Sequence, residues 1–110
     1  MKQQMHLDEI YYNRIKNGSK TIEMRLNDEK RRLLQVGDIL EFENRANGEI
    51  LKTTITNLYH YSSFKEIFDN FDIKTLGVDE DFTYKKMEKF YSKEEQEKYG
   101  VLAIEIKVGE

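Results

Sequence analysis

The sequence of 110 residues contains no cysteine and no proline. Without cysteine, neither disulfide bonds nor cysteine-ligated metals can hold the chain together, so a packed core must do so, and a chain of this length can bury one. No apolar run approaches the roughly 20 residues that a membrane-spanning helix needs, and no hydrophobic signal segment follows the N-terminus. We therefore expect residues 1–110 to form a single domain that is located in the cytoplasm and has no membrane partner.

Charge of both signs is plentiful, but it is unevenly distributed. The net charge of −3 argues against indiscriminate binding to polyanions. All arginines lie in the first half of the chain, at Arg14, Arg25, Arg31, Arg32 and Arg45. Between Arg14 and Arg32, seven basic residues accompany three acidic ones, and arginine is the side chain that binds phosphate or carboxylate through two parallel hydrogen bonds. An anion site is therefore expected in this segment; the alternative is a solvated face whose charges form ion pairs.

Patterns of apolar residues predict helices and strands in a mixed order. Helical spacing, capping boxes and glycine stops predict helices at residues 6–17, 63–71, 79–91 and 92–100. Period-two alternation and the hairpin dipeptide Asn47-Gly48 predict strands at residues 21–25, 38–44, 49–59 and 101–108. In the last strand, the side chains expected to point inward are Leu102, Ile104, Ile106 and Val108. Residues 27–35 are expected to form a loop with a helical turn. Because regular strand–helix alternation is missing, this order favours an α+β fold, a small β-barrel with helices around it.

Four polar residues directly follow the first predicted helix: Lys20, Thr21, Glu23 and Arg25. Thr21, Glu23 and Arg25 share one face of the strand at residues 21–25. Lysine and arginine can donate to a phosphate or a base edge, and a glutamate can accept from an exocyclic amine. These four residues are candidate ligand-binding residues, and the alternative is that this strand face meets solvent.

A second basic group follows the strand at Lys30, Arg31 and Arg32. These side chains could contact the backbone of a nucleic acid, with a solvated loop as the alternative. Some of the aromatic residues could stack on a base, but most are expected in the core. The two histidines, His6 and His60, are far apart in the sequence and are more typical of structural residues than of metal ligands. No metal site and no cofactor are predicted.

Three segments resemble landmarks of the ASCH domain family. The stretch from Leu7 to Arg25 resembles the family signature, which is a helix ending in glycine, a Lys-Thr turn and a strand that carries Glu and Arg. Residues 36–42 resemble its Gly-Asp entry into a barrel strand. Residues 91–101, with the alternating strand after them, resemble its closing segment. The resemblance covers nearly the whole chain.

The resemblance implies a PUA-like fold, which is a small mixed β-barrel with peripheral helices and a cleft between the two. It also implies binding of RNA or a nucleotide, with a role in RNA metabolism or translation-related regulation. In the family the cleft is lined by the turn and the strand after it. Carried over to this chain, the lining residues would be Lys20, Thr21, Glu23 and Arg25.

Some ASCH proteins of similar size are amidohydrolases that remove an acyl group from modified cytidine, such as acetylcytidine. Their site uses a lysine at the turn, a threonine three residues later and a glutamate further along the chain. Lys20 matches the lysine, but Glu23 occupies the threonine position, and the later glutamate has no clear counterpart. If this chain is an enzyme, Lys20 and Glu23 are the candidate catalytic pair, with the carboxylate as general base toward water and the ammonium stabilising negative charge.

Overall fold

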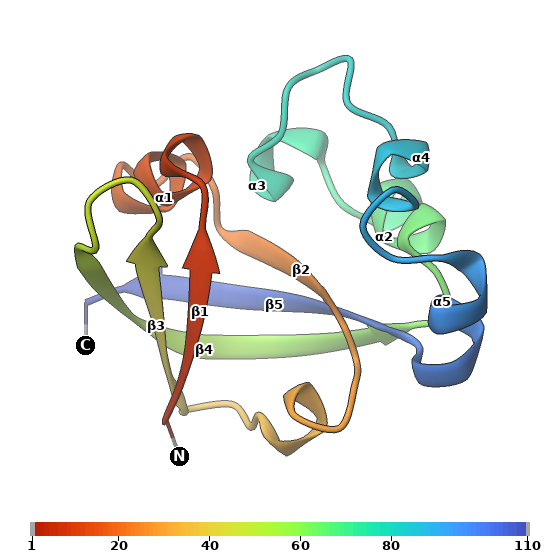
Figure 1. Ribbon diagram of the computed structural model, residues 1–110, viewed down its shortest axis with the longest axis horizontal. Helices are drawn as coiled ribbons and strands as arrows, with labels where there is room; N and C mark the ends of the chain where they lie inside the picture. The colour runs from red at the N-terminus through yellow and green to blue at the C-terminus, as the bar shows by residue number, and fades with distance from the viewer. Residues whose placement is uncertain (1, 110) are drawn as a thin grey trace.

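The computed structural model describes residues 2–109, which are arranged around one five-stranded sheet (Figure 1). The strands are β1 (Lys2–Leu7), β2 (Ile22–Leu26), β3 (Ile39–Asn44), β4 (Ile50–Tyr61) and β5 (Val101–Val108). Their order in the sheet is β1-β3-β4-β5-β2, with β1 parallel to β3 and the other neighbouring pairs antiparallel. The sheet curls into a half-barrel with helices beside it. The predicted α+β class and the PUA-like mixed barrel are therefore confirmed.

The helices of the described residues are α1 (Glu9–Lys16), η1 (Arg31–Leu33, a 3₁₀ turn), α2 (Phe64–Asn70), α3 (Ile73–Leu76), α4 (Tyr84–Met87) and α5 (Lys93–Tyr99). The predicted capping box opens α5, because the Ser92 hydroxyl accepts from the Glu95 N–H while the Glu95 carboxylate accepts from the Ser92 N–H. At α2 the cap is one-sided: Ser63 accepts from the Glu66 N–H, but the Glu66 carboxylate accepts from the Ser62 N–H. Figure 1 shows α2, α4 and α5 gathered at one end of β4 and β5, away from α1.

The start of the chain differs from the prediction. The helix expected at residues 6–17 begins only at Glu9, and residues 2–7 form β1, which was not predicted. Alternate residues of β1 are buried, but one of the three is Gln3, so the apolar alternation that marks a strand is weak. What stabilises β1 is its parallel pairing with β3, a contact between distant segments that no local pattern can reveal.

The helix predicted at residues 79–91 is also largely wrong. Only Tyr84–Met87 form the α-helix α4, and a loop leads into it, while α3 was not predicted. The loop is held by a distant partner, since the Arg14 guanidinium donates to the Gly77 carbonyl over 2.9 Å and to the Asp79 carboxylate over 2.7 Å. These contacts with α1 replace the helical turns that the local spacing predicted.

Two hydrophobic clusters meet at β5. The barrel cluster lies between α1 and the strands and comprises Met5, Leu7, Tyr12, Ile15, Leu34, Leu40, Phe42, Ile55, Leu102, Ile104 and Ile106. The helical cluster lies between β2, β5 and the later helices and comprises Ile22, Met24, Leu26, Phe64, Ile67, Leu76, Met87, Val101 and Ala103. Both faces of β5 are thus buried. Val108, which was expected to point inward, is 41% exposed because the strand continues past the barrel cluster.

The sheet has two edges, β1 and β2, which do not pair with each other in the described part of the chain. Side chains connect them instead. Arg25 of β2 donates through Nη2 to the His6 carbonyl of β1 over 3.2 Å, and Gln3 of β1 donates to the carbonyl of Lys30, in the loop that follows β2, over 2.7 Å. We call this opening between the edge strands the seam.

Candidate functional site

A pocket of about 250 Å³ lies at the seam. It is bordered by the end of β1, the start of α1, β2, the turn after β3 and the segment of residues 78–91. One side of this seam pocket, the apolar wall, consists of Met24, Val78, Phe82, Met87, Phe90 and Tyr91. Its polar side includes Lys20, Glu23 and Arg25, which we call the charged cluster. Glu23 and Arg25, two of the three residues predicted on the polar face of this strand, therefore line a pocket.

Glu23 is the centre of the charged cluster and is only 6% exposed. Its Oε1 lies 3.4 Å from the Lys20 ammonium and accepts from the Met24 N–H over 3.0 Å. Its Oε2 accepts from Arg25 Nε over 3.1 Å and from Arg25 Nη2 over 3.0 Å. Because a carboxylate offers about four lone-pair positions, these four donors saturate Glu23.

Lys20 is equally enclosed, with 3% of its surface exposed. Its ammonium donates to the Ile22 and Leu76 carbonyls, each over 2.7 Å, and its third proton is available for Glu23. The end of α3 covers the aliphatic stem: a Cβ atom on Gly77 would lie 2.3 Å from the Lys20 Cβ. Gly77 also has a φ of +66°. A residue with a side chain is therefore disfavoured at this position both by the clash with Lys20 and by the backbone conformation.

Burial and pairing set the pKa values of the cluster. Burial alone would raise the pKa of Glu23, but Arg25 and Lys20 together hold it below the ordinary value. Burial lowers the pKa of Lys20, and Glu23 opposes this effect. Three acceptors surround the ammonium: the Ile22 carbonyl, the Leu76 carbonyl and the Glu23 carboxylate. Burial opposes the charge of Arg25, yet Glu23 and then the Tyr91 phenol raise its pKa. In its geometry, the cluster places one carboxylate between two basic side chains.

Arg25 is the least enclosed member of the cluster, since its side chain is 15% exposed against 3% for Lys20 and 8% for Glu23. Its Nε and Nη2 are bound to Glu23 and to the His6 carbonyl. The Tyr91 phenol is a further side-chain hydrogen-bond partner of the guanidinium, and both residues line the pocket. The guanidinium is thus held in place by several protein groups while it lines the pocket, as a group that orients a ligand should be.

The predicted ligand-binding residues thus come together, with one exception. Lys20, Glu23 and Arg25 line one pocket, whereas Thr21 does not belong to its lining. Thr21 instead connects neighbouring segments, because its N–H donates to the Thr75 carbonyl and its carbonyl accepts from the Ile106 N–H.

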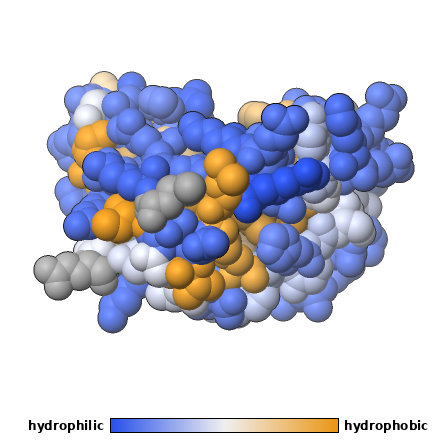
Figure 2. Space-filling view, turned by 90° about the horizontal axis from the view of Figure 1, so that it is seen from below, coloured by the Kyte–Doolittle hydropathy of each residue, from blue (hydrophilic) through white to orange (hydrophobic). Residues whose placement is uncertain are grey.

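The basic loop, which we define as Lys30, Arg31 and Arg32, lies elsewhere. Figure 1 places η1 at the end of the barrel opposite α1, and none of the three lines the seam pocket. Arg31 pairs with Asp28 at 3.0 Å, and Arg32 lies over the Tyr99 ring, 5.9 Å from its centroid. Figure 2 looks onto this end of the molecule, which is mainly hydrophilic with a limited apolar area. The basic residues of the charged cluster and those of the basic loop, both candidates from the sequence, therefore lie at separate places in the structure.

Other lining residues escaped the sequence reasoning. Phe90 was expected within a helix and Arg45 next to a hairpin, and neither position carried a local signal for a pocket. Tyr91 was among the aromatic residues mostly expected in the core. Its ring does stack on Phe64, with centroids 5.3 Å apart, and it also borders the pocket.

The described residues contain no group of three or more His, Cys, Asp or Glu side chains placed to hold a metal ion. His6 lies 3.2 Å from a Glu43 carboxylate oxygen, and His60 is exposed on β4. Among these same residues, no helix has both the length and the apolar character needed to cross a membrane.

Comparison with known proteins agrees with this architecture. A crystal structure titled "hypothetical protein PH0355" is 41% identical with a TM-score of 0.84, covering 99% of this chain and 100% of that one. The solution NMR structure of protein PF0455 from Pyrococcus furiosus is 35% identical with a TM-score of 0.73, covering 100% and 99%. The ASCH domain of Lactobacillus crispatus JV V101 is 20% identical with a TM-score of 0.65, covering 97% and 79%, and supports the fold alone. A search of curated protein sequences finds no significant match. The family model of the ASCH domain matches residues 5–110, and the chain therefore belongs to the ASCH domain family.

Proposed function

We propose that residues 1–110 form a single ASCH domain that binds RNA or a nucleotide in the cytoplasm, with a role in RNA metabolism or translation-related regulation. Membership of the ASCH family supports RNA binding by a PUA-like domain in general terms. The observation that carries the proposal is the seam pocket, where the guanidinium of Arg25 lies beside an apolar wall. A nucleobase has flat faces and a polar edge, and it is bound by apolar or aromatic walls with a few fixed polar groups.

Within the charged cluster the roles differ. Arg25 is the contact residue, because its guanidinium lines the pocket and this group can donate to a base oxygen or nitrogen or to a phosphate. Lys20 and Glu23 are positioning residues, since their donors and acceptors are occupied within the protein. Thr21 supports the pocket through its backbone hydrogen bonds.

The basic loop has a separate part in the proposal. Lys30, Arg31 and Arg32 would meet the sugar-phosphate backbone of a longer RNA, away from the pocket. Because the protein is acidic overall, such contacts would be local and sensitive to salt. They would strengthen binding of RNA and leave the affinity for a mononucleotide unchanged.

Titration with the nucleoside monophosphates and with a short single-stranded RNA, each at low and high salt, tests the proposal. We expect the logarithm of the association constant to fall linearly with the logarithm of the salt concentration. The slope should be somewhat less than one for each phosphate that the protein neutralises. Arg25→Ala should weaken binding of both ligands roughly tenfold or more, whereas Lys52→Ala, at an exposed position on β4, serves as the control. Absence of binding to every ligand at millimolar concentration, or an Arg25→Ala variant that binds like the wild type, would reject it.

A second candidate function is hydrolysis of an acylated nucleoside such as acetylcytidine. The observation that favours it is the Lys20–Glu23 contact of 3.4 Å in the pocket lining. Water would add to the acyl carbon, the C–N bond would break, and acetate and the free amine would leave. Glu23 could accept the proton of water only after exchanging one of its present donors, so this function requires the cluster to rearrange when substrate binds.

Incubation of the protein with acetylcytidine and chromatography of the products tests this candidate. Turnover that is lost in both Lys20→Ala and Glu23→Gln, with folding verified by circular dichroism, would support an enzyme. Unchanged acetylcytidine after prolonged incubation with the wild-type protein would exclude this substrate.

A further inference from the structure

Phe90 combines exposure with a place in the pocket. Its side chain is the most exposed of the large apolar residues that the structure describes, at 71%, and it lines the seam pocket. The other exposed apolar residues do not belong to the lining: Ile10, Leu33, Val36, Ile50 and Val108. An aromatic ring that is mostly in water at the mouth of a pocket gains little burial energy from folding, and a ligand that covers it would supply the rest.

The exposure of Phe90 does not come from a loose backbone. Its N–H donates to the Met87 carbonyl over 3.0 Å, and the N–H of Tyr91 donates to the same carbonyl over 2.9 Å. Met87 is buried, and Tyr91 is anchored by stacking on Phe64. The chain is therefore fixed on both sides of Phe90, and the ring is held at the pocket mouth.

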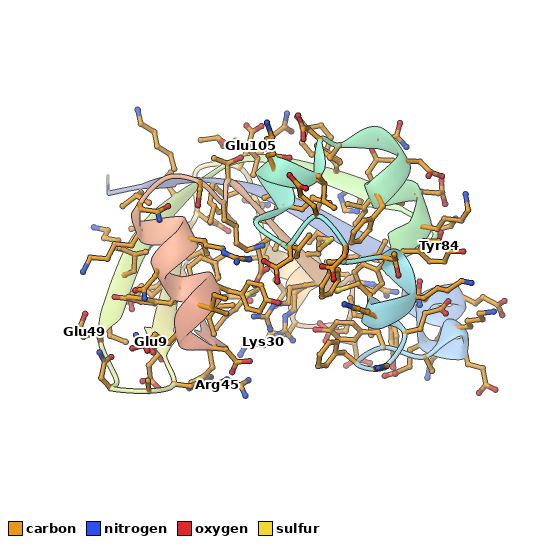
Figure 3. The ribbon with its side chains drawn as sticks, turned by 90° about the horizontal axis from the view of Figure 1, so that it is seen from above. Glu9, Lys30, Arg45, Glu49, Tyr84 and Glu105 are labelled. Atoms are coloured by element: carbon orange, nitrogen blue, oxygen red, sulfur yellow. The ribbon has the colours of Figure 1, made fainter. Side chains whose placement is uncertain are left out.

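Cations flank the same opening. Arg45 lines the pocket with a side chain that is 63% exposed, and its contact with the Asp8 carboxylate is long, at 3.9 Å. Lys86 of α4 is not part of the lining, but its ammonium lies 5.4 Å from the ring centroid of Phe82 in the apolar wall. Figure 3 shows Arg45 on the side of α1 and Tyr84, which starts α4, on the other side. Positive charge beside an exposed ring is the combination that single-stranded nucleic acid requires.

The size of the pocket limits what can enter it. Pockets for drug-sized ligands measure roughly 300–1,000 Å³, so a pocket of about 250 Å³ accommodates one base and leaves the neighbouring nucleotide outside. Building on the proposed function, we propose that the ligand is single-stranded RNA: one base enters the seam pocket, and the adjacent base stacks on Phe90. Arg45 and Lys86 contact the phosphates on either side.

Fluorescence anisotropy with a labelled single-stranded RNA about six nucleotides long, a length within the range that such sites cover, tests the inference. Unlabelled nucleoside monophosphates serve as competitors and report on the pocket alone. Phe90→Ala should weaken RNA binding roughly ten- to a hundredfold, the effect of losing one base–aromatic stack, and leave the mononucleotide affinity unchanged. Phe90→Tyr should keep the RNA affinity. Val108→Ala removes part of an exposed apolar side chain, 41%, that lies outside both the pocket and the basic loop, and should change neither affinity.

The outcomes separate this inference from the proposed function. If mononucleotides bind and Phe90→Ala leaves RNA affinity unchanged, Phe90 is not a stacking residue, although the pocket is still a nucleotide site. If the wild-type protein binds neither ligand, the proposed function fails and the inference fails with it. If sedimentation shows a wild-type dimer that Phe90→Ala converts to a monomer, Phe90 is a contact between two copies of the chain, and the inference is overturned.

Discussion

The charged cluster and the basic loop lie close together in the sequence and have opposite surroundings. Lys20 and Glu23 are 3% and 6% exposed, respectively, and every polar atom of their side chains is engaged within the protein. Lys30 and Arg32 of the basic loop are exposed. The two regions carry the same kinds of charged residue. Their different exposure to water, and not their composition, therefore sets how strongly their charges interact.

Water changes the strength of the same ion pair. Exposed pairs contribute about 0–1 kcal/mol, because solvent screens them and long side chains lose freedom on pairing. Removing one partner from a buried pair costs about 3–5 kcal/mol, since the other charge remains desolvated. The charged cluster can therefore orient a ligand group in one geometry, whereas the basic loop can follow a flexible polyanion.

The largest expected effect comes from Glu23→Gln. The change leaves Lys20 and Arg25 buried without their carboxylate, so the free energy of unfolding in urea should fall by about 3–5 kcal/mol. The matched change in the loop is Asp28→Asn, which removes the partner of Arg31; this pair is partly exposed, at 21% and 30%, so the change should cost less, about 1 kcal/mol. An equal decrease in the free energy of unfolding in the two variants would contradict the difference in ion-pair strength between the charged cluster and the basic loop.

A smaller effect is expected from Gly77→Ala, which tests the cover over Lys20. A methyl group there would lie 2.3 Å from the lysine Cβ, and overpacking of this kind costs about 1–3 kcal/mol in addition to the strain of a positive φ. Gly18→Ala is the control, because Gly18 has a φ of +88° but no atom near its added methyl. In chemical denaturation, the free energy of unfolding should fall further for Gly77→Ala than for Gly18→Ala. Similar decreases in the two variants would mean that Lys20 is not tightly covered.

Acid should weaken the fold through Glu23. Burial opposes ionisation of this carboxyl, but Arg25 and Lys20 keep its folded-state pKa below the ordinary 4.5. As the pH falls below that value the unfolded chain takes up a proton first, so the stabilisation present at neutral pH is lost as the pH approaches and passes the folded-state pKa. Urea midpoints between about pH 6 and pH 3 should decline less steeply in Glu23→Gln. A decline as steep as in the wild type would show that Glu23 does not contribute to acid sensitivity.

The smallest effect on stability is expected from Lys30→Ala and Arg32→Ala. Each should change the free energy of unfolding by less than about 0.5 kcal/mol, as is usual for surface positions. Each should also reduce the salt dependence of RNA binding by about one unit of slope and leave mononucleotide binding unchanged. An unaltered salt slope in both variants would remove the basic loop from the RNA contacts.

Local signals in the sequence were sufficient for several elements. The capping box at Ser92 places the start of α5, and the dipeptide Asn47-Gly48 places the turn between β3 and β4. The alternation of Leu102, Ile104 and Ile106 identifies the face of β5 that enters the barrel cluster. In each case the stabilising interaction involves residues that are near in sequence or repeat at a regular period, so a linear pattern reports it.

Contacts between segments that are distant in the sequence could not be predicted from such local signals. The pairing of β1 with β3, and the hydrogen bonds from Arg14 to residues 77 and 79, join segments that are distant in the sequence. Both predictions that missed these contacts, the early start of the first helix and the long helix at residues 79–91, were made from local spacing alone. Tertiary contacts override such spacing because intrinsic helix preferences differ by less than about 1 kcal/mol per residue for most residue types.

The amino-acid sequence alone determined the α+β class, the family resemblance, and the presence of Lys20, Glu23 and Arg25 together on one short stretch of chain. Only the tertiary structure decided that the sheet stays open between β1 and β2, that these charges are buried there, and that Phe90 and Arg45 join them at the pocket mouth. The physical reason is that residue type sets which interactions a side chain can make, whereas burial, which depends on distant segments, sets how strong those interactions are.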